Sequence, residues 1–151
     1  MVKKKIIEGV QYSVVAIIFR EDKILMFKRE GEKWETGWEF VKGAIHFGET
    51  KEQAVLREVN EESSVKVEIL GRVPKVYWGK KPYNDGFLKI HATVYACKYL
   101  SGDVKLGEPE HVSYRWMSYE EAKKKVWIEQ GRDAIEQAIN IYESSIKNIK
   151  G

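Results

Sequence analysis

The sequence predicts an α/β fold in which a mixed β-sheet lies between helices. Three observations lead to this prediction: β-rich segments occupy much of the chain, one amphipathic helix interrupts them near the middle, and helical periodicity returns at the end. Strands around one central helix, followed by terminal helices, are typical of a sheet that is covered on both faces.

The strands are predicted from runs of β-branched, aromatic and aliphatic residues. The runs 12–19 and 23–28 are separated by Glu21-Asp22, which favours a hairpin. A loop is expected at 31–37. Further strands are expected at 38–41, 65–78, 87–99 and 112–117.

The helices are predicted from capping signals and apolar spacing. Thr50 is followed three residues later by Gln53, which fits a capping box and predicts a helix over 51–62. Ser118 can cap a second helix over 119–128. Beyond Gly131, apolar residues recur at helical spacing as far as 146 and predict a third helix.

Length and composition favour one domain over residues 1–151, with enough apolar sequence for a core. No apolar run reaches the roughly 18 residues of a membrane span, and the first residues show no secretory signal, so a cytoplasmic protein is expected. The single cysteine, Cys97, excludes an internal disulfide and a cysteine metal cluster. A net charge of +3 is a mild bias toward anionic partners such as nucleotides.

Three glutamates, Glu58, Glu61 and Glu62, lie close together on the central helix. Like charges at this spacing cost about a few tenths of a kcal/mol per pair, which a bound cation would offset. Carboxylates are hard oxygen ligands suited to Mg²⁺ or Mn²⁺, and such ions neutralise a pyrophosphate and activate the attacking water. Without further motif residues, the alternative is that the three glutamates form an ordinary solvent-exposed face of the helix and bind no metal.

The spacing around these glutamates resembles a family signature. Gly43, five residues, Glu49, seven residues and the run 57–65 (REVNEESSV) resemble the Nudix box, G-x5-E-x7-R-E-U-x-E-E-x-G-U, of the Nudix hydrolases. Eight of its nine defined positions match, and Ser64 replaces the glycine. The resemblance implies a Nudix-type α/β/α sandwich that hydrolyses phosphoanhydrides with a divalent cation.

The site residues are predicted from this motif. Glu58 and Glu62 are expected to bind the metal, and Glu61 is either a third ligand or the base that takes a proton from water. Arg57 fits a bidentate ion pair with Glu49, and the family places an ion pair there.

The bend before the helix is expected to approach the ion or phosphate closely. Gly43 suits that approach because it has no Cβ, and the resemblance implies that the carbonyl of Lys42 also binds metal. At the other end of the helix, a left-handed Ser64 would cost about 1 kcal/mol, and the turn is expected to persist.

Two further stretches resemble diadenosine tetraphosphate hydrolases, and the first also resembles diphosphoinositol polyphosphate phosphohydrolases. The run 38–49 (WEFVKGAIHFGE) is similar to W-x-F-P-K-G-H-x-E-x-G-E, and the run 109–122 is similar to the EH-x-x-y-x-W ending of the first family. The resemblance implies that Glu110 enters the site as a ligand or base and that Lys42 contacts a polyphosphate. An ordinary surface carboxylate is the alternative for Glu110.

The segment 76–87 (VYWGKKPYNDGF) combines aromatic residues, lysines and a turn signal. A hairpin there could stack a base on an aromatic ring while lysines contact phosphates. The alternative is that the aromatic residues pack the sheet beneath an exposed lysine turn. The aromatic residues are Tyr77, Trp78 and Tyr83, and the lysines are Lys80 and Lys81.

The sequence therefore predicts a Mg²⁺- or Mn²⁺-dependent hydrolase of a nucleoside diphosphate linked to another moiety, with a dinucleoside polyphosphate as the leading substrate. An RNA 5′-end pyrophosphohydrolase, an ADP-ribose or oxidised-nucleotide pyrophosphatase, and a catalytically silent nucleotide-binding module are the alternatives. RNA is a possible partner that is not favoured, no membrane partner is expected, and the oligomeric state is left open.

Overall fold

The computed structural model describes residues 3–31 and 36–150, so positions 32–35 of the predicted loop lie outside the described residues. The described residues form one mixed sheet with strand order β4-β3-β2-β7-β6, in which β1 and β5 also pair with β2 and β8 pairs with β3. Strands β2 and β7 run parallel, and the other pairs are antiparallel. The strands are β1 (Ile6–Ile7), β2 (Val10–Arg20), β3 (Lys23–Glu30), β4 (Thr36–Glu39), β5 (Val41–Ala44), β6 (Lys66–Tyr83), β7 (Gly86–Ser101) and β8 (His111–Ser118).

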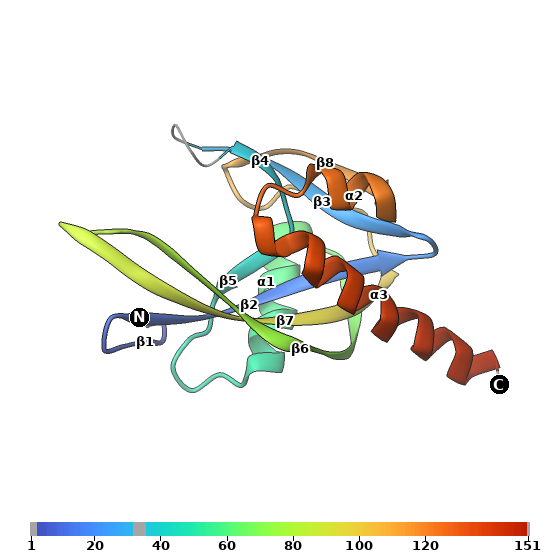
Figure 1. The fold of residues 1–151 in the computed structure, drawn as a ribbon, viewed down its shortest axis with the longest axis horizontal. Helices are drawn as coiled ribbons and strands as arrows, with labels where there is room; N and C mark the ends of the chain where they lie inside the picture. Colours follow the sequence, from blue (N-terminus) through green and yellow to red (C-terminus); the bar gives the residue numbers. More distant parts are fainter. Residues whose placement is uncertain (1–2, 32–35, 151) are drawn as a thin grey trace.

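Helices cover both faces of this sheet (Figure 1). Alternate residues of a strand point to opposite faces. On β2, Val14 packs with the helix α1 (Lys51–Ser63), whereas Ile17 packs with α2 (Tyr119–Lys125) and α3 (Glu129–Lys150). The predicted α/β class, with a mixed sheet between helices, is confirmed.

The C-terminal helices differ from the prediction. The helix expected over 119–128 ends at Lys125, and the last helix begins at Glu129, before Gly131 rather than after it. The chain leaves the helix because Val126 bridges to Trp38 and the backbone N–H of Trp127 donates to the Trp38 carbonyl at 3.0 Å. Tertiary pairing therefore overrides the local helical pattern.

Helix α1 begins where the sequence predicts and ends one residue later than predicted, at Ser63. The Thr50 hydroxyl accepts from the Gln53 backbone N–H at 3.0 Å, and the Gln53 side chain accepts from the Thr50 N–H at 2.9 Å. At the other end, Ser64 is left-handed with φ of 65°. The following loop docks here, because Lys105 and Gly107 donate backbone N–H groups to the carbonyls of Ser63 and Glu62. These contacts satisfy carbonyls that a helix end leaves unpaired.

Replacing Ser64 by glycine is expected to raise the melting temperature by about 1–4 °C. Glycine adopts a positive φ without the Cβ repulsion of about 1 kcal/mol that serine experiences. The neighbouring variant Ser63→Gly is the control, and it is expected to melt lower because Ser63 is helical and its hydroxyl donates to the Val59 carbonyl at 2.6 Å. An unchanged or lower melting temperature for Ser64→Gly contradicts the strain argument.

None of the described helices combines the length and the apolar character that a membrane-spanning helix requires.

Candidate active site

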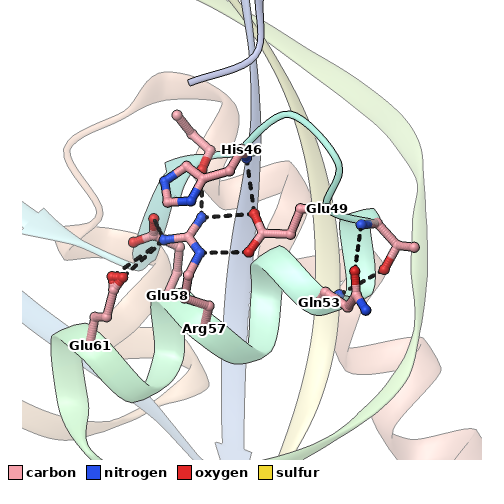
Figure 2. Close-up of polar contacts among 8 residues, drawn as sticks. His46, Glu49, Gln53, Arg57, Glu58 and Glu61 are labelled. Carbon is pink, nitrogen blue, oxygen red and sulfur yellow. Dashed lines mark hydrogen bonds and ion pairs between the residues drawn. The ribbon is translucent and has the colours of Figure 1, made fainter. Parts of the chain in front are cut away.

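Arg57 on α1 joins Glu49, Glu58 and Glu61 into one cluster (Figure 2). Its guanidinium donates to both oxygens of Glu49 at 2.7 and 3.0 Å, which is the bidentate pair that the sequence suggested. Another of its nitrogens donates to Glu58 at 2.7 Å and to Glu61 at 3.0 Å. The hydrogen bonds from Arg57 hold the pKa of Glu49 below its usual value. Arg57 therefore fixes one loop carboxylate and two helix carboxylates.

The bend between β5 and α1 is held against the same helix. Arg57 donates to the Ala44 carbonyl at 2.8 Å, and the His46 N–H donates to Glu49 at 2.9 Å (Figure 2). At Gly43, an added Cβ would lie 2.1 Å from the carboxylate carbon of Glu58. Because real Cβ atoms never approach this closely, glycine is required for the Glu58 carboxylate to lie against the bend.

Glu62 is the buried member of the cluster, with 5% of its surface exposed. Its Oε1 atom has no hydrogen-bond partner among the described residues. Burial raises the pKa of Glu62, and so do a hydrogen bond with Glu58 and the negative charges of Glu108 and Glu39. A buried carboxylate with an unpartnered oxygen and acidic neighbours is the environment that a divalent cation stabilises.

Glu108 is a candidate site residue that was not predicted from the sequence. One ligand atom from each of Glu62, Glu108 and His111 lies within 4.8 Å of the other two, an arrangement able to hold a metal ion. The family resemblance of the run 109–122 pointed instead to Glu110, two residues further on. In the structure, Glu110 pairs with Arg29 and is half-exposed. The run GEPEH contains both glutamates two residues apart, so the sequence alone could not show which of the two lies at the site.

A second network, also absent from the sequence prediction, lies behind these acids and centres on Glu39, whose side chain is fully buried. Arg29 donates to its carboxylate at 2.6 Å, and His111 lies at 2.9 Å. Trp127 donates to it at 3.2 Å, and the Lys42 ammonium lies at 3.3 Å. Burial alone would raise the pKa of Glu39, but the hydrogen bond with His111 and the charges of Lys42 and Arg29 lower it to about 2.

Arg29 connects this network to the loop that carries Glu108. One of its nitrogens lies 2.8 Å from Glu108, and another bonds Glu110. Because the same guanidinium is fixed to buried Glu39, it holds both loop carboxylates beside the end of α1.

Two adjoining cavities lie next to these residues and share Lys42. The first has a volume of about 300 Å³, and its lining includes Arg29, Lys42, Gly43, Lys81, Glu108 and Glu110. The second, of about 220 Å³, is mainly apolar, and its lining includes Phe40, Tyr77, Ile90, Val94 and Ile128. An apolar cavity beside a cavity of mixed charge suits a ligand with a ring at one end and phosphates at the other.

The structure separates the aromatic residues predicted to stack a base. Strand pairing places Tyr77 opposite Ala92, and both line the apolar cavity. Trp78 pairs with His91 and therefore points to the other face of the sheet. Tyr83 lies at the hairpin tip and is exposed.

The model of the NUDIX domain family matches residues 9–138. The chain belongs to the Nudix family. Among curated relatives, an RNA pyrophosphohydrolase of Tolumonas auensis is 32% identical over 124 residues, which cover 70% of this chain and 68% of the relative. The NAD-capped RNA hydrolase NudC of Salmonella schwarzengrund is 33% identical over 109 residues, covering 72% of this chain and 39% of NudC. The chain thus spans well under half the length of this second relative.

Solved Nudix structures share the fold. A MutT Nudix hydrolase from Burkholderia pseudomallei has a TM-score of 0.70 and 25% identity, over 85% of this chain and 97% of that protein. An Ap4A hydrolase from C. elegans, solved as a binary complex, has a TM-score of 0.72 over 89% of this chain and 98% of that protein. Because its identity is 18%, this second comparison supports the fold alone.

The predicted family membership and the prediction that the chain is an enzyme are confirmed by the family match and the curated relatives. These relatives support pyrophosphohydrolase activity for this Nudix chain. Nudix hydrolases generally use a divalent metal, and the oxygen-rich donor set around Glu62 fits such an ion. The single-domain prediction over residues 1–151 remains a proposal.

Proposed function

We propose that the chain hydrolyses a phosphoanhydride bond in a nucleoside diphosphate linked to another moiety, with Mg²⁺ or Mn²⁺ as cofactor. One observation carries this proposal: the Glu62 carboxylate is buried, has an unpartnered oxygen, and lies among Glu58 and Glu108 beside the glycine bend. Burying such a group is costly unless a cation compensates it.

The acids of α1 are proposed to hold the metal and the water. Glu58 and Glu62 serve as ligands, and Glu61 serves either as a third ligand or as the general base. Glu61 is half-exposed and is bonded to Arg57 together with Glu58. The cation, when bound, polarises phosphorus and lowers the pKa of the attacking water. Arg57 and Glu49 act as positioning residues, because they fix the loop to the helix.

The residues around the cavities are proposed to orient the substrate. The carbonyl of Lys42 is proposed as a further metal ligand, and its ammonium, fixed by Glu39, contacts phosphate. The backbone at Gly43 approaches the same phosphates. Glu108 joins Glu110 as a candidate added ligand or base, because Glu108 lies closer to Glu62 in the metal-competent cluster.

A dinucleoside polyphosphate remains the leading substrate. The apolar cavity with Tyr77 accepts one nucleoside, Lys42 and Lys81 contact the polyphosphate, and Tyr83 at the hairpin tip is available to the second nucleoside. A cytoplasmic location is also proposed, since nucleotides of this kind are intracellular metabolites.

RNA carrying a 5′-terminal phosphoanhydride is the second candidate substrate. The names of two relatives, an RNA pyrophosphohydrolase and a NAD-capped RNA hydrolase, favour it. ADP-ribose and oxidised nucleotides are further Nudix-type substrates to compare. A silent nucleotide-binding module is disfavoured because Glu58, Glu61 and Glu62 are all present beside the bend.

A substrate panel with Mg²⁺ tests the proposal. The panel contains diadenosine tetraphosphate, triphosphorylated RNA, NAD-capped RNA, ADP-ribose and an oxidised nucleoside triphosphate, with products identified by mass spectrometry. We expect phosphoanhydride cleavage and the highest kcat/KM on the dinucleoside polyphosphate. If no phosphoanhydride is cleaved while nucleotides still bind, the silent-module alternative replaces the proposal.

A further inference from the structure

One face of the β6–β7 hairpin carries aromatic rings and lysines that the proposed hydrolysis does not use. Figure 1 shows the paired ends of β6 and β7 projecting beyond the helices, near the N-terminal strand β1. Trp78 and Phe87, at 53% and 67% exposed, are among the most exposed large apolar residues described. Exposed apolar residues that form a contiguous patch mark a surface able to bind a partner.

The strand register places these residues together on the hairpin face opposite Tyr77, and two of them, Trp78 and Lys80, also border the apolar cavity. Trp78 pairs with His91, and His91 pairs with Tyr12 on β2, so the three rings share one face. Lys80 pairs with Lys89 on that same face. We call this set, with Phe87 and Lys5, the aromatic-basic face.

Contacts between these side chains order the surface. The Tyr12 and His91 rings lie 5.1 Å apart, and the His91 and Trp78 rings lie 4.9 Å apart in an edge-to-face arrangement. Lys5 lies 5.4 Å from the Tyr12 ring centre, and Lys80 lies 5.4 Å from that of Phe87. Three rings therefore contact one another in a row, a lysine lies against Tyr12 and another against Phe87, and the rings are positioned before a ligand arrives.

Positive charge extends from this face toward the start of α1. The pKa of Lys51 is lowered, first by burial and then by the positive charges of Arg72 and Lys5. The negative charge of Glu52 at the start of α1 opposes this lowering, and the acids Glu8 and Asp85 lie in the turns at the ends of the two hairpins. A face with this charge attracts a polyanion.

We propose that the aromatic-basic face binds single-stranded RNA, with bases stacking on Trp78 and Phe87 and with Lys5, Lys80 and Lys89 contacting phosphates. Every base has a ring face that stacks on an aromatic side chain, and lysines follow the backbone without reading sequence. The choice of RNA as the polymer rests on the second candidate of the proposed function. None of these residues is proposed as a metal ligand or a base, and only Trp78 and Lys80 border the cavity proposed for a nucleoside.

The test measures binding of a fluorescein-labelled 12-nucleotide RNA with a 5′-hydroxyl group by fluorescence anisotropy. This RNA has no phosphoanhydride, so its binding does not depend on the proposed hydrolysis. For the wild type we expect saturable binding that weakens with salt, with a log–log slope of about −2 for three lysine contacts. Trp78→Ala is expected to weaken binding by about 5- to 100-fold.

Paired lysine variants separate this face from general surface charge. Lys80→Ala/Lys89→Ala is expected to weaken binding and to reduce the salt slope by about 1.4. The control Lys66→Ala/Lys124→Ala removes the same charge at exposed lysines on β6 and α2, away from the hairpin tip, and is expected to bind nearly as the wild type does. Thermal melting of each variant verifies folding.

Two results would overturn the proposal. One is an absence of saturable wild-type binding at about 50 mM salt, where polyanion contacts are strong. The other is equal weakening by the two double variants. If sedimentation shows instead that Trp78→Ala converts a dimer to a monomer while RNA binding is unchanged, the face is an interface between two copies of this chain.

Discussion

The Glu62→Gln variant is expected to lose about 10²- to 10³-fold in kcat while remaining folded. Glutamine keeps the shape of the side chain but removes the charge that holds the proposed cation at the end of α1. The position is buried and already crowded by Glu58 and Glu108, so the neutral amide relieves repulsion. When a chelator keeps both proteins free of metal, the melting temperature of Glu62→Gln is therefore expected to equal or exceed that of the wild type.

Steady-state hydrolysis and thermal melting check this expectation together. The matched control is Glu68→Gln, which removes one charge from an exposed residue of β6 and is expected to hydrolyse substrate at the wild-type rate. A kcat for Glu62→Gln within about threefold of the control would show that the buried carboxylate does not take part in the chemistry.

The Gly43→Ala variant is expected to lower kcat by about 10²-fold with only a small change in stability. The added Cβ would lie 2.1 Å from the Glu58 carboxylate carbon. Because the obstructing atoms end a flexible side chain, the fold can survive by moving that carboxylate. Glu58 would then leave both the bend and its 2.7 Å contact with Arg57.

The control for this variant is Gly86→Ala, where an added Cβ meets no heavy atom within 4 Å. It is expected to retain wild-type kcat. If Gly43→Ala hydrolyses substrate as fast as Gly86→Ala does, close packing of Glu58 against the bend is not required.

Local sequence signals predicted α1 and its surroundings well. The capping box, the left-handed Ser64 and the Arg57–Glu49 pair are all present. These features depend on residues within one helix or one adjoining loop, so fixed spacing in the sequence determines them. For the same reason, the family signature could be identified before the fold was known.

The network behind the site could not be predicted in the same way. Arg29 meets Glu39, 10 residues away, but meets Glu108 and Glu110 across 79 and 81 residues. No local period encodes contacts between such distant segments. Glu110 was therefore predicted by resemblance alone, and Glu108, Glu39 and Arg29 were not predicted.

The orientation of the hairpin aromatics was also beyond local prediction. Register shifts between Ile69 and Gly71 and between Arg72 and Val76 change which residues of β6 face each helix layer. Tyr77 and Trp78 point to opposite faces because they are adjacent in the strand, and these shifts determine which of the two faces each one occupies. A change of one residue in the register is sufficient to exchange the faces to which the two side chains point.

A Mn²⁺ titration followed by electron paramagnetic resonance, which reports the free ion, measures directly whether the buried glutamate cluster binds metal. The proposed site predicts saturable binding to the wild type that is at least about 10-fold weaker in Glu62→Gln and unchanged in Glu68→Gln. Equal Mn²⁺ affinity in all three proteins would contradict the assignment of the buried glutamate cluster as the metal site.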